Sequence, residues 1–278
     1  MSAGTSSRPA AGAADGRMPL VEHLRELRNR LGTSLLAIAV CVAVIGFFFW
    51  EPVFDLLKAP YCETPQGAAS CQLFAFGPFE QFTVRLRVSF LAGTVVASPV
   101  WLYQFGAFVT PALHKQEKRY AGGFLGAALV LFVAGAALAY VTVSTGLEFL
   151  LTIGGDGITT LPSIQSYLSF VTLTLVAFGI AFEFPVVVMF LNMVGVFPST
   201  KMRAWRRGMV VALFALSAVI TPSQDPFTFI FLALPLYALY EGCILLARLR
   251  ERSRRRRDPL ATLDDDETSR LDPAPPTD

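Results

Sequence analysis

Long apolar segments constrain this chain more than any other feature of its sequence. A transmembrane helix needs about 20 mainly apolar residues. Only 16% of the residues are charged, whereas 54% are hydrophobic. The apolar residues fall into six segments: 32–50, 88–108, 120–143, 166–194, 209–220 and 227–247. The pattern predicts an all-α integral membrane protein with six transmembrane helices.

The fifth apolar segment is too short to cross a bilayer alone. Met209–Ile220 would form a helix of about 18 Å at 1.5 Å per residue. The hydrocarbon core is about 30 Å thick. Either this helix takes in residues from Ala204 onward, or the bilayer thins around it; we favour thinning.

Lys and Arg are distributed unequally between alternate connections. Segments 17–30, 114–119, 201–207 and 248–257 carry four, three, four and seven of them. Connections 51–78, 144–165 and 221–226 carry one, none and none. Basic loops stay on the cytoplasmic side of a membrane, so both termini are predicted to be cytoplasmic.

The two ends of the chain differ in composition from the middle. Residues 1–17 are predicted to be a disordered lead without a cleavable signal peptide, because they contain no apolar core. Residues 18–250 form the predicted six-helix membrane domain, which opens with an amphipathic helix at the membrane surface. Residues 251–278, with a basic and then an acidic block, are predicted to be a disordered cytoplasmic tail.

The four cysteines fall into two groups. Cys41 and Cys243 lie in apolar segments and are interpreted as small buried side chains. Cys62 and Cys71 lie in a connection predicted to face away from the cytoplasm, where thiols oxidise. We predict a disulfide between them; two free surface thiols are the alternative.

No catalytic or metal-binding motif is present in the sequence. It contains neither a Walker loop nor an HExxH, a GxSxG or a Cys/His metal spacing. The chain is therefore not predicted to be an enzyme, and no cofactor or metal is expected. Any work that it performs would depend on a partner or an ion gradient.

Three charged residues lie in or beside the predicted spans. Glu183 is in the middle of an apolar segment, where a charge costs a few kcal/mol. Pro185 follows it and is expected to bend the helix. Glu183 therefore indicates a polar cavity or a helix contact, or else a hydrogen-bonded structural carboxyl. Glu241 lies near the cytoplasmic end of the last span, and Arg87 near the outer end of the second; we interpret Glu241 as packing, and Arg87 as an interface anchor or a partner of a buried acid.

Two further acids lie in basic cytoplasmic segments. Glu26 and Glu117 contribute little to topology. A pair of carboxylates at a membrane surface would suit a ligand that carries guanidinium groups, because Arg–carboxylate pairs are bidentate and strong. Local charge balancing, with Arg30 for Glu26 and Lys118 for Glu117, is the alternative.

Four sequence blocks, in order, resemble the TatC family, the multispanning subunit of the twin-arginine protein translocase. They are His23-Leu-Arg-Glu-Leu-Arg-Asn-Arg-Leu31, Ser98–Phe108 with Pro111 and Glu117, Ser166–Phe170 with Phe182-Glu-Phe-Pro185, and Ile220–Asp225. The similarity covers about residues 19–250 and implies a concave bundle with two short last helices. Cys62, Cys71 and the long tail fall outside the family pattern.

The resemblance implies roles for particular residues. Glu26, Arg28, Phe108 and Glu117 match positions that recognise twin-arginine signal peptides. Glu183 matches a polar intramembrane position on the concave face. Two further matches are an acid of the last outer loop, Asp225, and a basic position at the start of the second span, Arg87.

The resemblance also implies partners and a location. The family works with the small single-span proteins TatA and often TatB, associates with itself, and uses the proton-motive force without a nucleotide. The implied location is the bacterial cytoplasmic (inner) membrane, and the implied ligands are signal peptides of folded proteins.

Two other functions are compatible with six spans. A proton-coupled transporter of a small solute would use Glu183 as the proton carrier, but such folds usually contain two repeated halves, and no second Pro-interrupted segment corresponds to Pro185. A scaffold or insertase would bind apolar segments regardless of their arginines.

Overall fold

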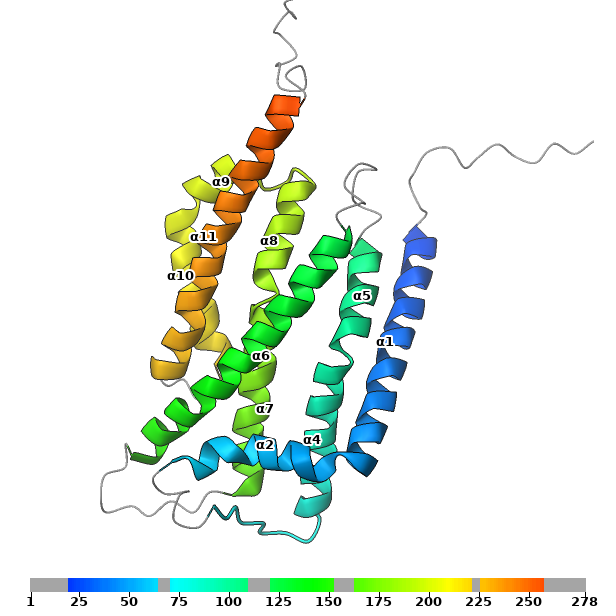
Figure 1. Cartoon of the computed structure of the whole chain (residues 1–278), viewed down its shortest axis with the longest axis vertical. Helices are drawn as coiled ribbons and strands as arrows, with labels where there is room; N and C mark the ends of the chain where they lie inside the picture. Colours follow the sequence, from blue (N-terminus) through cyan, green and yellow to red (C-terminus); the bar gives the residue numbers. More distant parts are fainter. Residues whose placement is uncertain (1–19, 65–70, 110–120, 153–162, 222–225, 258–278) are drawn as a thin grey trace, which may run out of the picture.

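The protein folds as a bundle of helices, seen in a computed structural model that describes residues 20–64, 71–109, 121–152, 163–221 and 226–257 (Figure 1). Every regular element in these ranges is a helix, apart from an isolated bridge between Phe74 and Ser163. The prediction of an all-α membrane protein is confirmed.

Helix α1 (Leu20–Phe48) joins the predicted surface helix and the first span in one rod of 29 residues. It packs along α4 (Glu80–Val96) and α5 (Ser98–Val109). Helices α4 and α5 form a broken span with a bend of 55°. The break falls at Ala97 because Pro99 has no backbone N–H to continue the helix. The second span thus starts at Glu80, earlier than the predicted residue 88.

Residues 51–62, expected to belong to a loop, form a helix together with Trp50. Helix α2 (Trp50–Cys62) lies across one end of the bundle (Figure 1). Its side chains Leu57 and Tyr61 recur at helical spacing and are buried against α4, α6 and α7. The hydroxyls of Tyr167 and Tyr140 donate to the carbonyls of Leu57 and Leu56 at 2.6 and 2.9 Å. The sequence of α2 contains an amphipathic pattern, but Pro52 and Pro60 led to the prediction of a loop.

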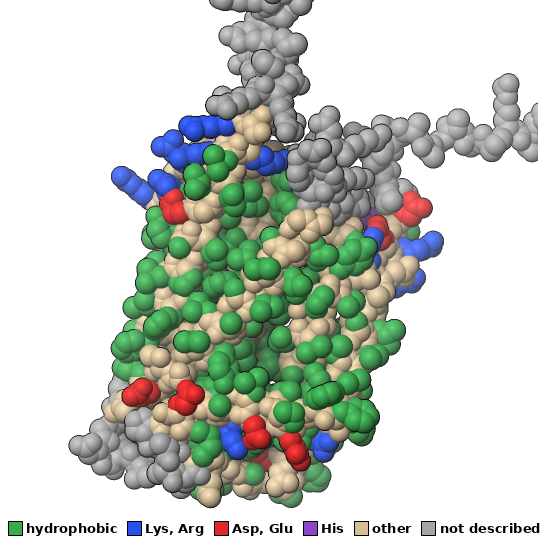
Figure 2. Space-filling model, in the orientation of Figure 1, with side chains coloured by type: hydrophobic (Ala, Val, Ile, Leu, Met, Phe, Trp, Pro, Cys, Tyr) green, Lys and Arg blue, Asp and Glu red, His purple; other side chains and the backbone are tan. Residues whose placement is uncertain are grey.

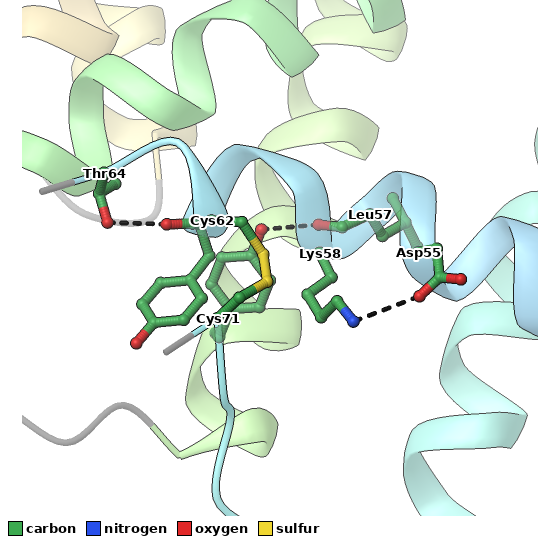
Figure 3. The surroundings of a disulfide bond; sticks show 8 residues. Asp55, Leu57, Lys58, Cys62, Thr64 and Cys71 are labelled. Atoms are coloured by element: carbon green, nitrogen blue, oxygen red, sulfur yellow. Dashed lines mark hydrogen bonds and ion pairs between the residues drawn. A yellow bond between two sulfur atoms is a disulfide. The ribbon is translucent and has the colours of Figure 1, made fainter. Parts of the chain in front are cut away.

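A disulfide joins Cys62, at the end of α2, to Cys71 (Figure 3). Their Cα atoms lie 4.8 Å apart. Thr64, which follows Cys62, donates its hydroxyl to the carbonyl of Tyr61 at 2.7 Å. The bond therefore ties the segment that leads into α4 to the helix that covers this end of the bundle.

Removing this disulfide is expected to destabilise the α2 end. Closure of so short a loop contributes about 2.5 kcal/mol, so Cys62→Ala/Cys71→Ala should lower the thermal midpoint by about 5–10 °C. Cys41→Ala removes a free, half-buried thiol and serves as the control. Reductant should affect the wild type and the control alike. A wild-type midpoint that reductant leaves unchanged would contradict the prediction.

The centre of the bundle is built from α6 (Ala121–Thr152), α7 (Ile164–Ala181) and α8 (Phe184–Met193). Helix α6 extends beyond the predicted end of the third span at Val143. It crosses α7 closely because Gly135 has no side chain where a Cβ would lie 2.7 Å from the carbonyl oxygen of Phe178. Helix α8 ends before Gly195, whose φ of 86° suits a left-handed helix end.

The C-terminal part contains α9 (Ser199–Ala204), α10 (Arg206–Ile220) and α11 (Pro226–Arg257). Helix α10 begins before the predicted Met209, but its 15 residues span only about 22 Å. Two expectations were wrong. The last helix is not short, since α11 has 32 residues. The segment after residue 250 also begins helical, because its Glu and Arg residues favour helix beyond the membrane.

Within the part of the chain that the structure describes, four helices are long and apolar enough to span a membrane, and the broken pair α4–α5 would make a fifth. The short α10 does not meet that length. Helix α1 begins and α11 ends at the same end of the bundle, where α5 also ends and α6 begins (Figure 1). Lys and Arg side chains gather at this end (Figure 2). We call it the basic end, and it corresponds to the side predicted to be cytoplasmic.

Candidate functional site

Glu26 lies at the basic end in a network that links α1 to α5. Arg30 donates to Glu26 Oε1 from Nε at 2.9 Å and from Nη2 at 2.6 Å. Its Nη1 donates to Gln104 Oε1 at 3.2 Å. All three residues are partly exposed. No hydrogen bond from the described residues reaches Glu26 Oε2. Arg30 therefore balances the charge of Glu26 while one carboxylate oxygen remains available.

His23 and Phe108 form a second contact between α1 and α5, about one turn of α1 from Glu26. Their rings stack with centroids 4.4 Å apart and planes 17° apart. This contact joins the first turns of α1 to the end of α5. Arg28 is exposed on α1 and forms no ion pair or hydrogen bond with the described residues. We call Glu26, Arg30, Gln104, His23 and Phe108 the α1–α5 site.

An apolar groove of about 480 Å³ begins at the α1–α5 site and continues into the bundle. Helix α1 contributes one wall from Leu27 to Ile38, a length of about 16 Å. The remaining lining comes from α4, α5, α6 and α7, and includes Phe90, Trp101, Phe105, Phe132, Val176 and Ile180. Because Phe90, Phe105 and Ile180 are exposed, the groove opens at the surface of the protein.

Glu183 lies at the break between α7 and α8. Its backbone N–H donates to the carbonyl of Ile180 at 3.0 Å, in a tight turn that ends α7. Pro185 then starts α8, where its missing N–H costs nothing. The side chain is half-buried, and its Oε1 atom is buried with no hydrogen-bond partner among the described residues. Ile180, one turn earlier, lines the groove.

Arg87 lies between α4 and α7, near the end opposite to the α1–α5 site. Its Nη1 atom donates to Ser169 Oγ and, at 3.5 Å, to the carbonyl of Gln165. The partners are neutral groups of α7, and no acid of the described residues pairs with Arg87. Glu80 reinforces the same contact by accepting from the hydroxyl of Ser163 at 3.2 Å. Arg87 thus links two helices.

Glu241 forms an ion pair with Arg206 across α10 and α11. Its other oxygen accepts a hydrogen bond from the Tyr237 hydroxyl at 3.0 Å. Both Glu241 oxygens are therefore used within the protein. This arrangement belongs to helix packing at the basic end and lies on different helices from the α1–α5 site.

Two of the sequence-based candidates, Glu117 and Asp225, lie outside the described residues. Gln104 and Arg30 were not among the candidates, although they complete the network of Glu26. Gln104 could have been noticed as a polar residue in an apolar segment. Its distance of 74 positions from Arg30 gave no sign that the two meet.

No group of His, Cys, Asp and Glu that could hold a metal ion exists among the described residues. The fold and the site together define a multi-pass helical membrane protein in which a charged network lies at the head of an intramembrane apolar groove.

The comparisons with known proteins identify the family. Residues 22–235 match the family described as Sec-independent protein translocase protein (TatC). A TatC of Frankia casuarinae is 48% identical over 94% of this chain and 76% of its own length. A TatC of Aquifex aeolicus is 38% identical over 86% of this chain and 98% of its own length. The chain belongs to the TatC family.

Solved structures agree with this assignment. A crystal structure of the twin-arginine translocase receptor TatC matches with a TM-score of 0.68 and 36% identity, over 83% of this chain and all of that one. A second, determined in the detergent DDM, matches with a TM-score of 0.69 and 37% identity. The protein is a multi-pass membrane subunit of a Sec-independent translocase, and it is not an enzyme.

Proposed function

We propose that this protein is the receptor subunit of a twin-arginine translocase and binds twin-arginine signal peptides at the α1–α5 site. Glu26 and Glu117 would receive the arginine pair, and Arg28 and Phe108 would contact the same signal motif. The supporting observation is the Glu26 carboxylate at the head of an apolar groove, with one oxygen not bonded to any described residue. A carboxylate can accept a second guanidinium in this way.

The size of the groove fits the other half of such a ligand. A signal peptide carries a positively charged start followed by an apolar stretch of about 7–15 residues. As a helix, that stretch would be about 10–22 Å long. The α1 wall of the groove is about 16 Å long, and it starts one residue after Glu26. The charged and apolar parts of the ligand would therefore meet matching parts of one surface.

Glu183 supports a contact with a single-span partner in the same proposal. A buried carboxyl oxygen without a partner among the described residues calls for a polar group or a proton. TatA, and possibly TatB, would supply that group when the translocase assembles, with several copies of this chain in one complex. Export of folded proteins would then use the proton-motive force, in the bacterial cytoplasmic (inner) membrane. Nothing in the structure favours the rival solute transporter.

Site-specific photo-crosslinking tests the groove. Leu35 lines it, whereas the adjacent Leu36 lies at the same depth, is exposed and does not line it. A photoreactive residue at position 35 is expected to crosslink to the apolar stretch of a twin-arginine signal, and one at position 36 is not.

A substrate with lysines in place of both arginines provides the second arm. Lysine lacks the bidentate fork, so crosslinking at position 35 should fall strongly. Equal crosslinking at both positions would rule out the groove. An undiminished signal with the lysine substrate would favour a scaffold that binds any apolar segment.

A further inference from the structure

Arginines from three helices gather at the basic end where α9, α10 and α11 meet. Arg203 lies on α9 and Arg206 begins α10, while Arg248 and Arg252 lie one turn apart on α11. Helix α9 packs against both α10 and α11. Lys and Arg side chains cover this part of the surface (Figure 2). We call these four residues the arginine cluster. They lie on different helices from the α1–α5 site and its groove.

The cluster has more positive charge than the acids of the described residues around it neutralise. Arg248 lies within electrostatic range of Arg203, Arg206 and Arg252, and of Glu241 as an opposing charge. Glu241 already pairs with Arg206 and accepts from Tyr237. The nearby Glu251 accepts hydrogen bonds from Ser199 and Asn192. An additional anion would therefore be stabilised here.

Two donors of the cluster are also unmet. Arg206 Nε and Arg248 Nη2 are buried, and neither has a hydrogen-bond partner among the described residues. A buried donor without a partner costs about 1–3 kcal/mol. Planar guanidinium groups match the oxygens of a phosphate, each by two parallel hydrogen bonds. A phosphate-bearing anion would therefore suit these guanidinium groups.

The surroundings of the cluster indicate where that phosphate comes from. Trp205, next to Arg206, is 65% exposed, as is typical of a side chain at the membrane–water interface. Below it, α10 exposes Val211 and Val219, at 69% and 83%. An acyl chain would cover this apolar face. We propose that the arginine cluster binds the phosphate headgroup of an anionic lipid whose chains lie along α10.

The proposal gives the short α10 a physical role. The helix spans only about 22 Å, so a headgroup held at Arg206 lies deeper than in an undisturbed bilayer with its core of about 30 Å. A lipid bound here anchors the local thinning that a short helix requires. The site is independent of signal-peptide binding.

Quenching of tryptophan fluorescence by brominated lipids tests the proposal. The chain has three tryptophans, so Trp50→Phe/Trp101→Phe leaves Trp205 as the reporter. This protein is reconstituted with dibrominated phosphatidylglycerol or phosphatidylcholine. We expect phosphatidylglycerol to be preferred several-fold at Trp205. Arg203→Gln/Arg248→Gln should bring the preference to about one, since it removes two guanidinium groups and leaves the Arg206–Glu241 pair.

The control variant removes the same charge from the same surface. Lys201→Gln/Arg207→Gln changes two exposed cations outside the cluster and should keep the preference. If the first double variant does not reconstitute, Arg248→Lys serves, because it keeps the charge without the fork and should still reduce the preference. Equal losses in test and control variants, or no loss in either, would overturn the proposal. Displacement of the lipid by millimolar glycerol phosphate would assign the site to a soluble phosphate and overturn the lipid assignment.

Discussion

Glu26→Gln is expected to weaken binding of a twin-arginine signal peptide by about ten- to a hundredfold. The substitution keeps the size of the side chain and removes its charge. A hydrogen bond to a charged group contributes about 1.5–3 kcal/mol, and each 1.4 kcal/mol changes the dissociation constant tenfold. Arg30 would keep its hydrogen bond to Gln104, so the α1–α5 contact should survive. Binding of a labelled peptide to the purified protein in nanodiscs measures the change.

Glu22→Gln is the matched control for that experiment. Glu22 lies one turn before Glu26 on the same helix and is exposed. Its replacement by Gln removes the same charge. It should leave the dissociation constant within about twofold. Insertion of both variants is checked by extraction and by thermal melting. Wild-type affinity in Glu26→Gln, or an equal loss in Glu22→Gln, would remove Glu26 from the proposed binding site.

Gly135→Val is expected to cause the largest loss of stability among the substitutions considered. The new Cβ would lie 2.7 Å from the carbonyl oxygen of Phe178 and 2.8 Å from the ring of Phe182. Phe178 is fully buried, and its carbonyl belongs to the helix backbone. Neither the side chain nor the carbonyl of Phe178 can therefore move away easily. Overpacking costs about 1–3 kcal/mol or more. Because the contact is with helix backbone, we expect the upper end of this range, about 3 kcal/mol, which lowers the thermal midpoint by about 6–12 °C, with less folded protein recovered from the membrane.

Gly126→Val provides the comparison within the same helix. A Cβ at Gly126 would meet nothing within 4 Å. The variant should therefore melt close to the wild type, because it adds the same side chain to an open surface. Similar midpoints for Gly135→Val and the wild type would mean that α6 and α7 do not approach as closely as described. Loss in both variants would point to helix propensity in place of packing.

The candidate site shows which residues and contacts the sequence pattern can predict and which it cannot. Glu26 and Phe108 were predicted from the resemblance, and the structure places both at the head of the groove. Their role in binding stays a prediction. Arg30 appeared only as a possible charge partner, and Gln104 did not appear at all. Short-range pairs such as Glu26 and Arg30 follow from helix geometry, whereas a contact across 74 positions does not.

Most helices could likewise be predicted from the sequence, whereas α2 could not. Apolar segments of about 20 residues could be assigned to a membrane because no backbone polar group can remain unpaired in lipid, so each must form a helix. The basic loops indicated a common side for both ends of the chain. The residues of α2 were mistaken for a loop, since two prolines conceal a helix that exists by packing on α4, α6 and α7.

Apolar length and charge distribution, both local properties of the chain, were enough to establish a multi-pass helical protein, and four ordered motifs were enough to indicate its family. The close crossing at Gly135, the break beside Glu183, the groove and the arginine cluster depend on how separate helices meet. In a membrane these contacts arise from close packing and from pairing of polar groups between helices. Such contacts join residues far apart in the chain, and only the folded arrangement decides them.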